Sequence, residues 1–267
     1  MKKTLLAMLG MGLVMGANSV HANIPQPDIY QQSYALYTLY HPANKDQSTA
    51  AITQQLSADF ASLFKANKKV TEAQFIAFEQ QRLEPLLKQR REMSLKQTYV
   101  RFGILDANKD QKMTLKEFQA SGMKTFDELD KNQDGTISDV EVKLFGSNTA
   151  THDGFKVRLP ISMPMANTPT EFIQTYGQGK AYTTLGDYLS ARDNQFIQTD
   201  SNKDTVITEQ EYVDEFMQRF DANSVTGKEK MKQLAAEQFK TIAKGKSYIE
   251  SRDIADFAKK IDQALGQ

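Results

Sequence analysis

The chain has 267 residues, and its 33 Lys and Arg balance its 33 Asp and Glu, so the formal net charge is zero. It contains no Cys and only three His, which excludes disulfides, thiolate zinc sites, cysteine nucleophiles and a series of histidine-ligated metal centres. Zero net charge gives no global field for nucleic acid, so we expect no nucleic-acid partner.

The N-terminus has the pattern of a secretory signal. Two lysines precede an apolar run over residues 4–16, and Val20 and Ala22 occupy the positions that signal peptidase reads. We therefore predict a signal peptide over residues 1–22 and a periplasmic or secreted protein. The alternative is a membrane anchor, but the run is too short to span a bilayer. No other stretch is long and apolar enough, so we predict no transmembrane segment after signal removal.

Two segments before the first acidic loop are expected to be helical. Residues 23–57 form an N-terminal lead segment with four tyrosines, suited to a leading helix packed on the rest of the fold, or alternatively to a partner-docking surface. Residues 85–105 are predicted to form a helix that Pro85 opens.

The first acidic loop spans residues 106–117, DANKDQKMTLKE. Its oxygen donors alternate along the chain, as wrapping one hard cation requires. The candidate metal ligands are Asp106, Asn108, Asp110, the Lys112 carbonyl, Thr114 through water, and Glu117. Gln111 stands at position 6, where a glycine would permit the sharp turn.

The second acidic loop spans residues 130–141, DKNQDGTISDVE, and has Gly135 at position 6. Its candidate ligands are Asp130, Asn132, Asp134, the Thr136 carbonyl, Ser138 and Glu141. Residues 146–169 follow, with three prolines, and are predicted to be an irregular linker.

The third acidic loop spans residues 200–211, DSNKDTVITEQE. Its candidate ligands are Asp200, Asn202, Asp204, the Val206 carbonyl, Thr208 and Glu211. Thr205 stands at position 6, and a β-branched residue with positive φ is strained. Residues 221–227 begin in a similar way but lack the closing Glu, so we interpret them as a turn.

The three loops resemble the EF-hand calcium-binding family in their ligand order, in a Phe four residues before each first Asp, and in the S/T-x-x-E capping box that opens each outgoing helix. The resemblance implies Ca²⁺ as the bound ion and an all-α array of helix–loop–helix units with short β-bridges between loops. Asx-rich turns without metal are the alternative, but three complete ligand sets disfavour it.

Local charge ranks the acidic loops. Loops 130–141 and 200–211 each carry four acids against one Lys, whereas loop 106–117 carries three acids against three Lys. A more negative loop attracts a divalent cation more strongly. We therefore predict that loop 130–141 binds calcium most tightly, loop 200–211 next and loop 106–117 most weakly.

Loop spacing predicts a larger repeat. Twelve residues separate Glu117 from Asp130, which suits one shared helix of roughly 20 Å, although Gly122 could break it. Three acid-poor loops would then supply partners, at residues 64–75, 177–188 and 243–254. The predicted bridges pair Val70 with Met113, Ile137 with Tyr182, and Ile207 with Ile249. The array would divide into two regions, residues 58–145 and 170–267.

The sequence gives no support for enzymatic activity. His41 and His152 are far apart, and no phosphate loop or nucleophile motif is present. Two binding functions remain open. Calcium could stabilise a fold that binds an envelope protein or polymer, or the chain could be a calcium sensor or buffer. The seven Met after residue 22 form no dense cluster, which favours the structural role.

Overall fold

The computed structural model describes residues 27–42, 48–145 and 157–263, and the predicted signal peptide and His152 lie outside these ranges. The described chain is mostly helical, which confirms the all-α class. The helices are α1 (Ile29–Tyr40), α2 (Thr49–Asp59), α3 (Ala61–Ala66), α4 (Glu72–Leu105), α5 (Leu115–Leu129), α6 (Asp139–Phe145), α7 (Pro169–Tyr176), α8 (Leu185–Thr199), α9 (Glu209–Ala243) and α10 (Ser251–Gln263). In the described ranges, no helix has the length and apolar character needed to cross a membrane.

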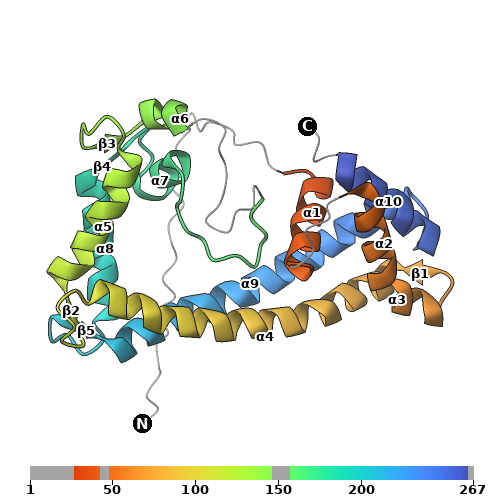
Figure 1. The fold of residues 1–267 in the computed structure, drawn as a ribbon, viewed down its shortest axis with the longest axis horizontal. Coiled ribbons are helices and arrows are strands. Elements are labelled where there is room, and N and C mark those ends of the chain that lie inside the picture. Colours follow the sequence, from red (N-terminus) through yellow and green to blue (C-terminus); the bar gives the residue numbers. More distant parts are fainter. Residues whose placement is uncertain (1–26, 43–47, 146–156, 264–267) are drawn as a thin grey trace, which may run out of the picture.

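Three short antiparallel bridges join the first half of the chain to the second (Figure 1). They are formed by strands β1 (Val70–Thr71) with β6 (Tyr248–Ile249), β2 (Lys112–Thr114) with β5 (Val206–Thr208), and β3 (Thr136–Ile137) with β4 (Thr183–Thr184). Each bridge centres on a fully buried pair: Val70 faces Ile249, Met113 faces Ile207, and Ile137 faces Thr183.

The chain is folded back on itself like a long hairpin. Helix α4, with 34 residues, packs against α9, with 35 residues, and α5 packs against α8, each with 15 residues (Figure 1). Because the paired helices match in length, the strands at their ends lie opposite each other and can form the three bridges.

Two of the three predicted bridge pairings were wrong. Val70 and Met113 lie at opposite ends of α4, which at 34 residues is roughly 50 Å long. Ile207 and Ile249 likewise lie at opposite ends of α9, which has 35 residues, so they cannot pair. The predicted pairing of loop 130–141 with loop 177–188 is confirmed, but Ile137 faces Thr183 rather than Tyr182, which is 42 % exposed. As a result, acidic loops 106–117 and 200–211 pair with each other, and only loop 130–141 pairs with an acid-poor loop.

Two local predictions also failed because the helices are longer than expected. Pro85 lies inside α4, which begins thirteen residues earlier at a capping box of Thr71 and Gln74. Residues 221–227, predicted as a turn, continue α9, and Asp221 there accepts two hydrogen bonds from Arg91 of α4 at 2.8 and 2.9 Å. Packing of α4 on α9 outweighs the local turn and proline signals.

The predicted helix shared by loops 106–117 and 130–141 is confirmed as α5. Gly122 does not break it. The glycine is buried where α5 crosses α8, and a Cβ there would lie 2.3 Å from Cδ of Arg192. Gly122 therefore permits the close approach of the Arg192 side chain.

The lead segment packs on the array, as predicted. Tyr37 of α1 is buried in a core cluster with residues of α2, α4, α9 and α10, and Tyr30 and Tyr34 border the same cluster. Separate clusters lie beneath the β2–β5 and β3–β4 bridges. Each of these clusters draws residues from both halves of the chain.

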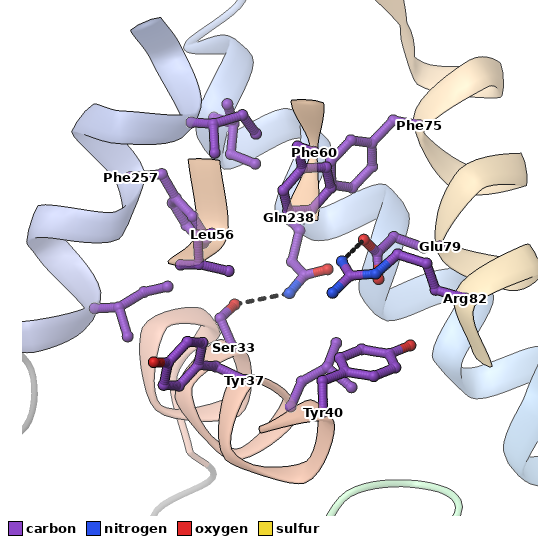
Figure 2. A pocket seen from close by; sticks show the side chains of 14 residues that line it. Ser33, Tyr37, Tyr40, Leu56, Phe60, Phe75, Glu79, Arg82, Gln238 and Phe257 are labelled. Carbon is purple, nitrogen blue, oxygen red and sulfur yellow. Dashed lines mark hydrogen bonds and ion pairs between the residues drawn. The ribbon is translucent and has the colours of Figure 1, made fainter. Parts of the chain in front are cut away.

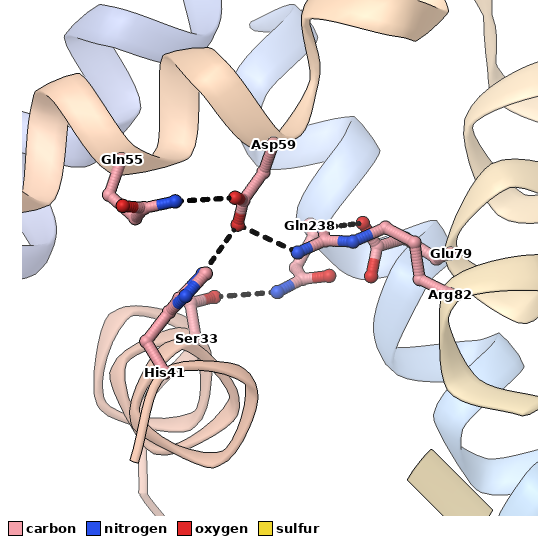
Figure 3. A network of polar contacts seen from close by, with 7 residues as sticks. All are labelled: Ser33, His41, Gln55, Asp59, Glu79, Arg82 and Gln238. Carbon is pink, nitrogen blue, oxygen red and sulfur yellow. Dashed lines mark hydrogen bonds and ion pairs between the residues drawn. The ribbon is translucent and has the colours of Figure 1, made fainter. Parts of the chain in front are cut away.

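A polar network ties α1 and α2 to the long helices (Figure 3). Asp59 accepts from Arg82 at 2.8 Å and lies 2.7 Å from Nε2 of His41, while Arg82 also donates to Glu79 at 2.9 Å. Burial raises the pKa of Glu79, although the Arg82 guanidinium opposes this. His41 thus helps to hold α1 on α2.

The cavity beside this network is a packing defect rather than a ligand site. Tyr37, Phe75 and Phe257 line it, and Ser33 and Gln238 are hydrogen-bonded across it at 2.9 Å (Figure 2). Its volume is about 30 Å³. That is far below the roughly 300 Å³ at which small-molecule pockets begin.

The described part of the linker, residues 157–168, is irregular, as predicted, but it is firmly seated on α9. Leu159 and Ile161 are buried, and Asn223 of α9 donates to the Ser162 carbonyl at 3.3 Å. Gly227 makes the contact possible, because a Cβ there would lie 2.9 Å from the Pro160 carbonyl and 3.0 Å from Cα of Ile161.

Candidate metal-binding loops

The first Asp of each acidic loop ends the incoming helix. The backbone N–H groups of Asp106, Asp130 and Asp200 each donate to the carbonyl of a Phe four residues earlier at 2.9 Å. All three Asp side chains are buried. The capping position therefore points each carboxylate into its own loop.

The acidic loops share one pattern of internal hydrogen bonds. The position-1 Asp accepts from the backbone N–H of position 6, at 2.8 Å in loop 106–117 and 2.9 Å in the other two. The position-3 Asn accepts from the N–H of position 5, and the position-5 Asp accepts from the N–H of position 7. These bonds orient the side-chain oxygens of positions 1, 3 and 5 on alternate residues.

The backbone of all three loops turns through two left-handed residues, at positions 4 and 6. Position 4 is Lys109, Gln133 or Lys203, with φ of 60°, 59° and 63°. Position 6 is Gln111, Gly135 or Thr205, with φ of 65°, 77° and 73°. The expectation of positive φ at Gln111 and Thr205 is confirmed, and both carry a steric cost that Gly135 does not.

Replacing Thr205 with Gly should therefore stabilise the protein. Relief of the left-handed strain, about 1–2 kcal/mol, exceeds the extra chain entropy of glycine, about 0.5–1 kcal/mol. Urea unfolding in a calcium chelator measures the change. The matched reverse substitution is Gly135→Thr, a position with no atom within 4 Å of an added Cβ, and it should destabilise. A Thr205→Gly protein that is less stable than the parent would contradict the expectation.

The closing Glu of each loop accepts from the N–H of position 9 at 2.9 Å. In two loops its other oxygen is also satisfied. Glu117 Oε1 accepts from the N–H groups of Ala107 and Asn108, and Glu211 Oε1 accepts from Ser201 and Asn202.

These hydrogen bonds favour the ionised closing carboxylates. The bond from the Thr114 N–H lowers the pKa of Glu117. Burial acts to raise the pKa of Glu211, but hydrogen bonds from Thr208 and Ser201 outweigh it and lower the pKa to about 2. Both groups are therefore negatively charged at neutral pH.

Glu141 differs from the other two. Its side chain is fully buried, and Oε2 accepts from the N–H and hydroxyl of Ser138 at 2.9 and 3.0 Å. Oε1 is also buried, yet it has no hydrogen-bond partner among the described residues. A buried carboxylate oxygen without a donor is costly, so this atom marks a position where a cation would be favourable.

The structure places all eighteen predicted ligands in three loops, but it does not bring the acids of any loop fully together. Across the described ranges, no group of three or more His, Cys, Asp or Glu side chains is close enough to hold a metal ion. The three predicted carbonyl ligands belong to Lys112, Thr136 and Val206, the residues that begin strands β2, β3 and β5.

Lysines neutralise two of the acid-poor loops. In loop 177–188, Asp187 occupies the capping position equivalent to the closing Glu and is paired with Lys180. In loop 243–254, Asp253 accepts from the N–H of Glu250 and pairs with Lys246 at 2.7 Å. The hydrogen bond from Lys180 lowers the pKa of Asp187 to about 2. In both loops the carboxylate is therefore paired with a lysine ammonium of the same loop.

Sequence reasoning missed Ser201, whose hydroxyl donates to Glu211 Oε1 at 2.9 Å. Position 2 carries no ligand in the expected pattern, so nothing singled it out. No protein-family model matches the chain, and neither a curated protein nor a solved structure shows significant similarity to it.

Proposed function

We propose that the chain is an exported EF-hand protein that binds Ca²⁺ in loops 106–117, 130–141 and 200–211, and that the bound ions stabilise the fold. Three features support this. The loops share a backbone path, they carry the same oxygen ligand order, and two of them are tied by the β2–β5 bridge.

The observation that carries the proposal is the orphaned Oε1 atom of Glu141. Burying a charged oxygen without a donor or a counter-charge is unfavourable, and a cation in the loop would remove that penalty. Hard oxygen donors from carboxylates, an amide and a carbonyl suit calcium rather than a soft metal.

The loops would bind with limited rearrangement. The Asp and Asn side chains at positions 1, 3 and 5 are already aligned by backbone N–H groups. Glu117 and Glu211 would have to exchange the N–H partners of Oε1 for the ion, whereas Glu141 Oε1 has no such partner within the described part of the chain. This difference, together with the charge of −3 on loop 130–141, supports that loop as the tightest site.

Isothermal titration calorimetry of the metal-free protein tests the proposal. We expect three sites, and we expect Asp130→Ala to remove the tightest, Asp200→Ala the next and Asp106→Ala the weakest. Asp139→Asn is the matched control, because it removes the same charge from loop 130–141 at an exposed side chain paired with Lys143. Absence of binding, or equal losses from Asp130→Ala and Asp139→Asn, would refute the proposal.

The structure favours a stabilising role over a sensor role. A sensor opens a Met-rich apolar groove on loading. Here Met113, Met217 and Met231 are buried in three separate clusters. Calcium should therefore raise the melting temperature without exposing dye-binding apolar surface. Calcium-induced dye binding would favour the sensor.

Export and an envelope partner are supported by the N-terminal pattern alone, which precedes the described residues. Cell fractionation of the full chain tests the location, and affinity capture with and without calcium tests for a protein or polymer partner. A chain retained in the cytoplasm with its first 22 residues intact would refute export.

A further inference from the structure

A large cleft lies inside the bend of the hairpin, away from the candidate ligands. It has a volume of about 640 Å³, and residues of α4, α5, α7, α8, α9 and the linker line it. A second cavity of about 200 Å³ adjoins it and shares Arg101, Arg158 and Phe216. Small-molecule sites typically have roughly 300–1,000 Å³.

The cleft concentrates arginine in a chain whose net charge is zero. Five of the eight arginines line the two cavities, but none of the 25 lysines does so. These are Arg90, Arg101, Arg158, Arg192 and Arg219. Glu171 is the one carboxylate among the described lining residues, and Arg158 already pairs with it at 3.2 Å. Arg219 is held by Glu215 one turn earlier on α9, with hydrogen bonds of 2.5 and 3.1 Å. Among the described residues, the positive charge left without a carboxylate partner therefore includes Arg101 and Arg192.

Two of the arginines retain unused binding capacity. Arg101 has no carboxylate partner and no hydrogen-bond partner within the described residues, and its guanidinium lies 5.9 Å from the Phe216 ring centroid. Arg192 donates only to the Phe118 carbonyl and the Ser121 hydroxyl, again counting the described chain. A guanidinium presents paired donors that match carboxylate and phosphate groups.

Aromatic rings lie among these charges. The Phe216 ring lies near two guanidinium groups. The Arg101 guanidinium is 5.9 Å from the ring centroid, and the Arg219 guanidinium is 5.5 Å from it. Tyr212 also lines the cleft, together with Arg101, Arg192 and Arg219. The groups thus converge from α4, α8 and α9.

We propose that this arginine cleft binds a small organic anion, in which a carboxylate or phosphate group contacts Arg101 and Arg192 and an aromatic or apolar body lies against Phe216 and Met163. None of the lining residues is a proposed calcium ligand, so the inference stands independently of calcium binding.

Calorimetric titration of the full chain with phenyl phosphate and with benzoate tests this inference. We expect one site for at least one of the two, and the tighter of them identifies the anionic group. Inorganic phosphate, which lacks the ring, and phenol, which lacks the anionic group, should bind much more weakly.

Variants then locate the site. Arg101→Gln and Arg192→Gln should each weaken binding about tenfold or more, because each removes a charge-assisted contact to the anionic group. Arg252→Gln is the matched control, since Arg252 is 78 % exposed on α10 and pairs with Glu250. The inference is overturned if neither probe binds, if phenol or inorganic phosphate binds equally well, or if Arg252→Gln weakens binding as much as Arg101→Gln. Two cleft variants are used so that a folding defect in one leaves the other to decide.

Discussion

Glu141→Gln is expected to change stability in opposite directions with and without calcium. In a chelator the variant should be more stable than the parent by about 1 kcal/mol, because an amide is less costly to bury with an unpaired atom than a carboxylate. In excess calcium it should be less stable. Losing one site costs about 2.7 kcal/mol when calcium is about 100-fold above the dissociation constant.

The matched variant Glu211→Gln should not show the reversal. Glu211 is stabilised in its ionised form by hydrogen bonds that lower its pKa to about 2. A depressed pKa contributes stability above the unfolded value of about 4.5, and this is lost as pH falls toward 2. Glu211→Gln should therefore destabilise the protein in chelator at neutral pH.

Urea unfolding of both variants in chelator and in calcium provides the measurement. If Glu141→Gln is destabilised in chelator as strongly as Glu211→Gln, Oε1 of Glu141 is satisfied in solution and the main support for a cation in loop 130–141 is lost.

Gly227→Ala is expected to destabilise the protein by roughly 1–3 kcal/mol, the usual cost of overpacking. The sign is opposite to the ordinary effect of Gly→Ala within a helix, a gain of about 0.5–1 kcal/mol. The reason is the linker, since the new methyl group would meet the backbone of Pro160 and Ile161 at 2.9 and 3.0 Å. Backbone atoms cannot move aside as a flexible side chain can.

Gly103→Ala is the control for this prediction. Gly103 lies in α4, and a Cβ there meets no atom within 4 Å. That substitution should be stabilising. Urea unfolding followed by circular dichroism measures both changes in chelator. Stabilisation by both substitutions would mean that residues 159–161 are not seated on α9 in solution.

Local chemistry was predictable because its determinants are close in sequence. The capping boxes of Thr114 with Glu117 and Thr208 with Glu211 open α5 and α9 as expected. The strained positions Gln111 and Thr205 adopt positive φ, as their place in the ligand order indicated. The bridge residues themselves, Val70, Ile137 and Ile249 among them, were also found, because a short apolar segment before a helix start is a local signal.

Which bridge strands pair with each other could not be predicted, because intervals of similar length between bridge residues contain different structures. Forty-three residues separate Val70 from Met113, and forty-five separate Ile137 from Tyr182. The first interval is filled by the continuous helix α4, which drives its ends apart, whereas the second contains the linker, which lets the chain fold back. Pro85 and residues 221–227 pointed to breaks within α4 and α9, yet the packing of these helices on each other kept both continuous.

The sequence by itself therefore determined the three acidic loops, their ligand order and their differences in charge, since each is a property of twelve consecutive residues. The tertiary structure alone decided which loops are paired, which closing carboxylate has a buried oxygen without a partner in the described residues, and how five arginines line one cleft and the cavity that adjoins it. The physical reason is the same in each case. These features depend on contacts between helices from opposite halves of the chain, and such contacts follow from the matched lengths of α4 with α9 and of α5 with α8 rather than from any local pattern.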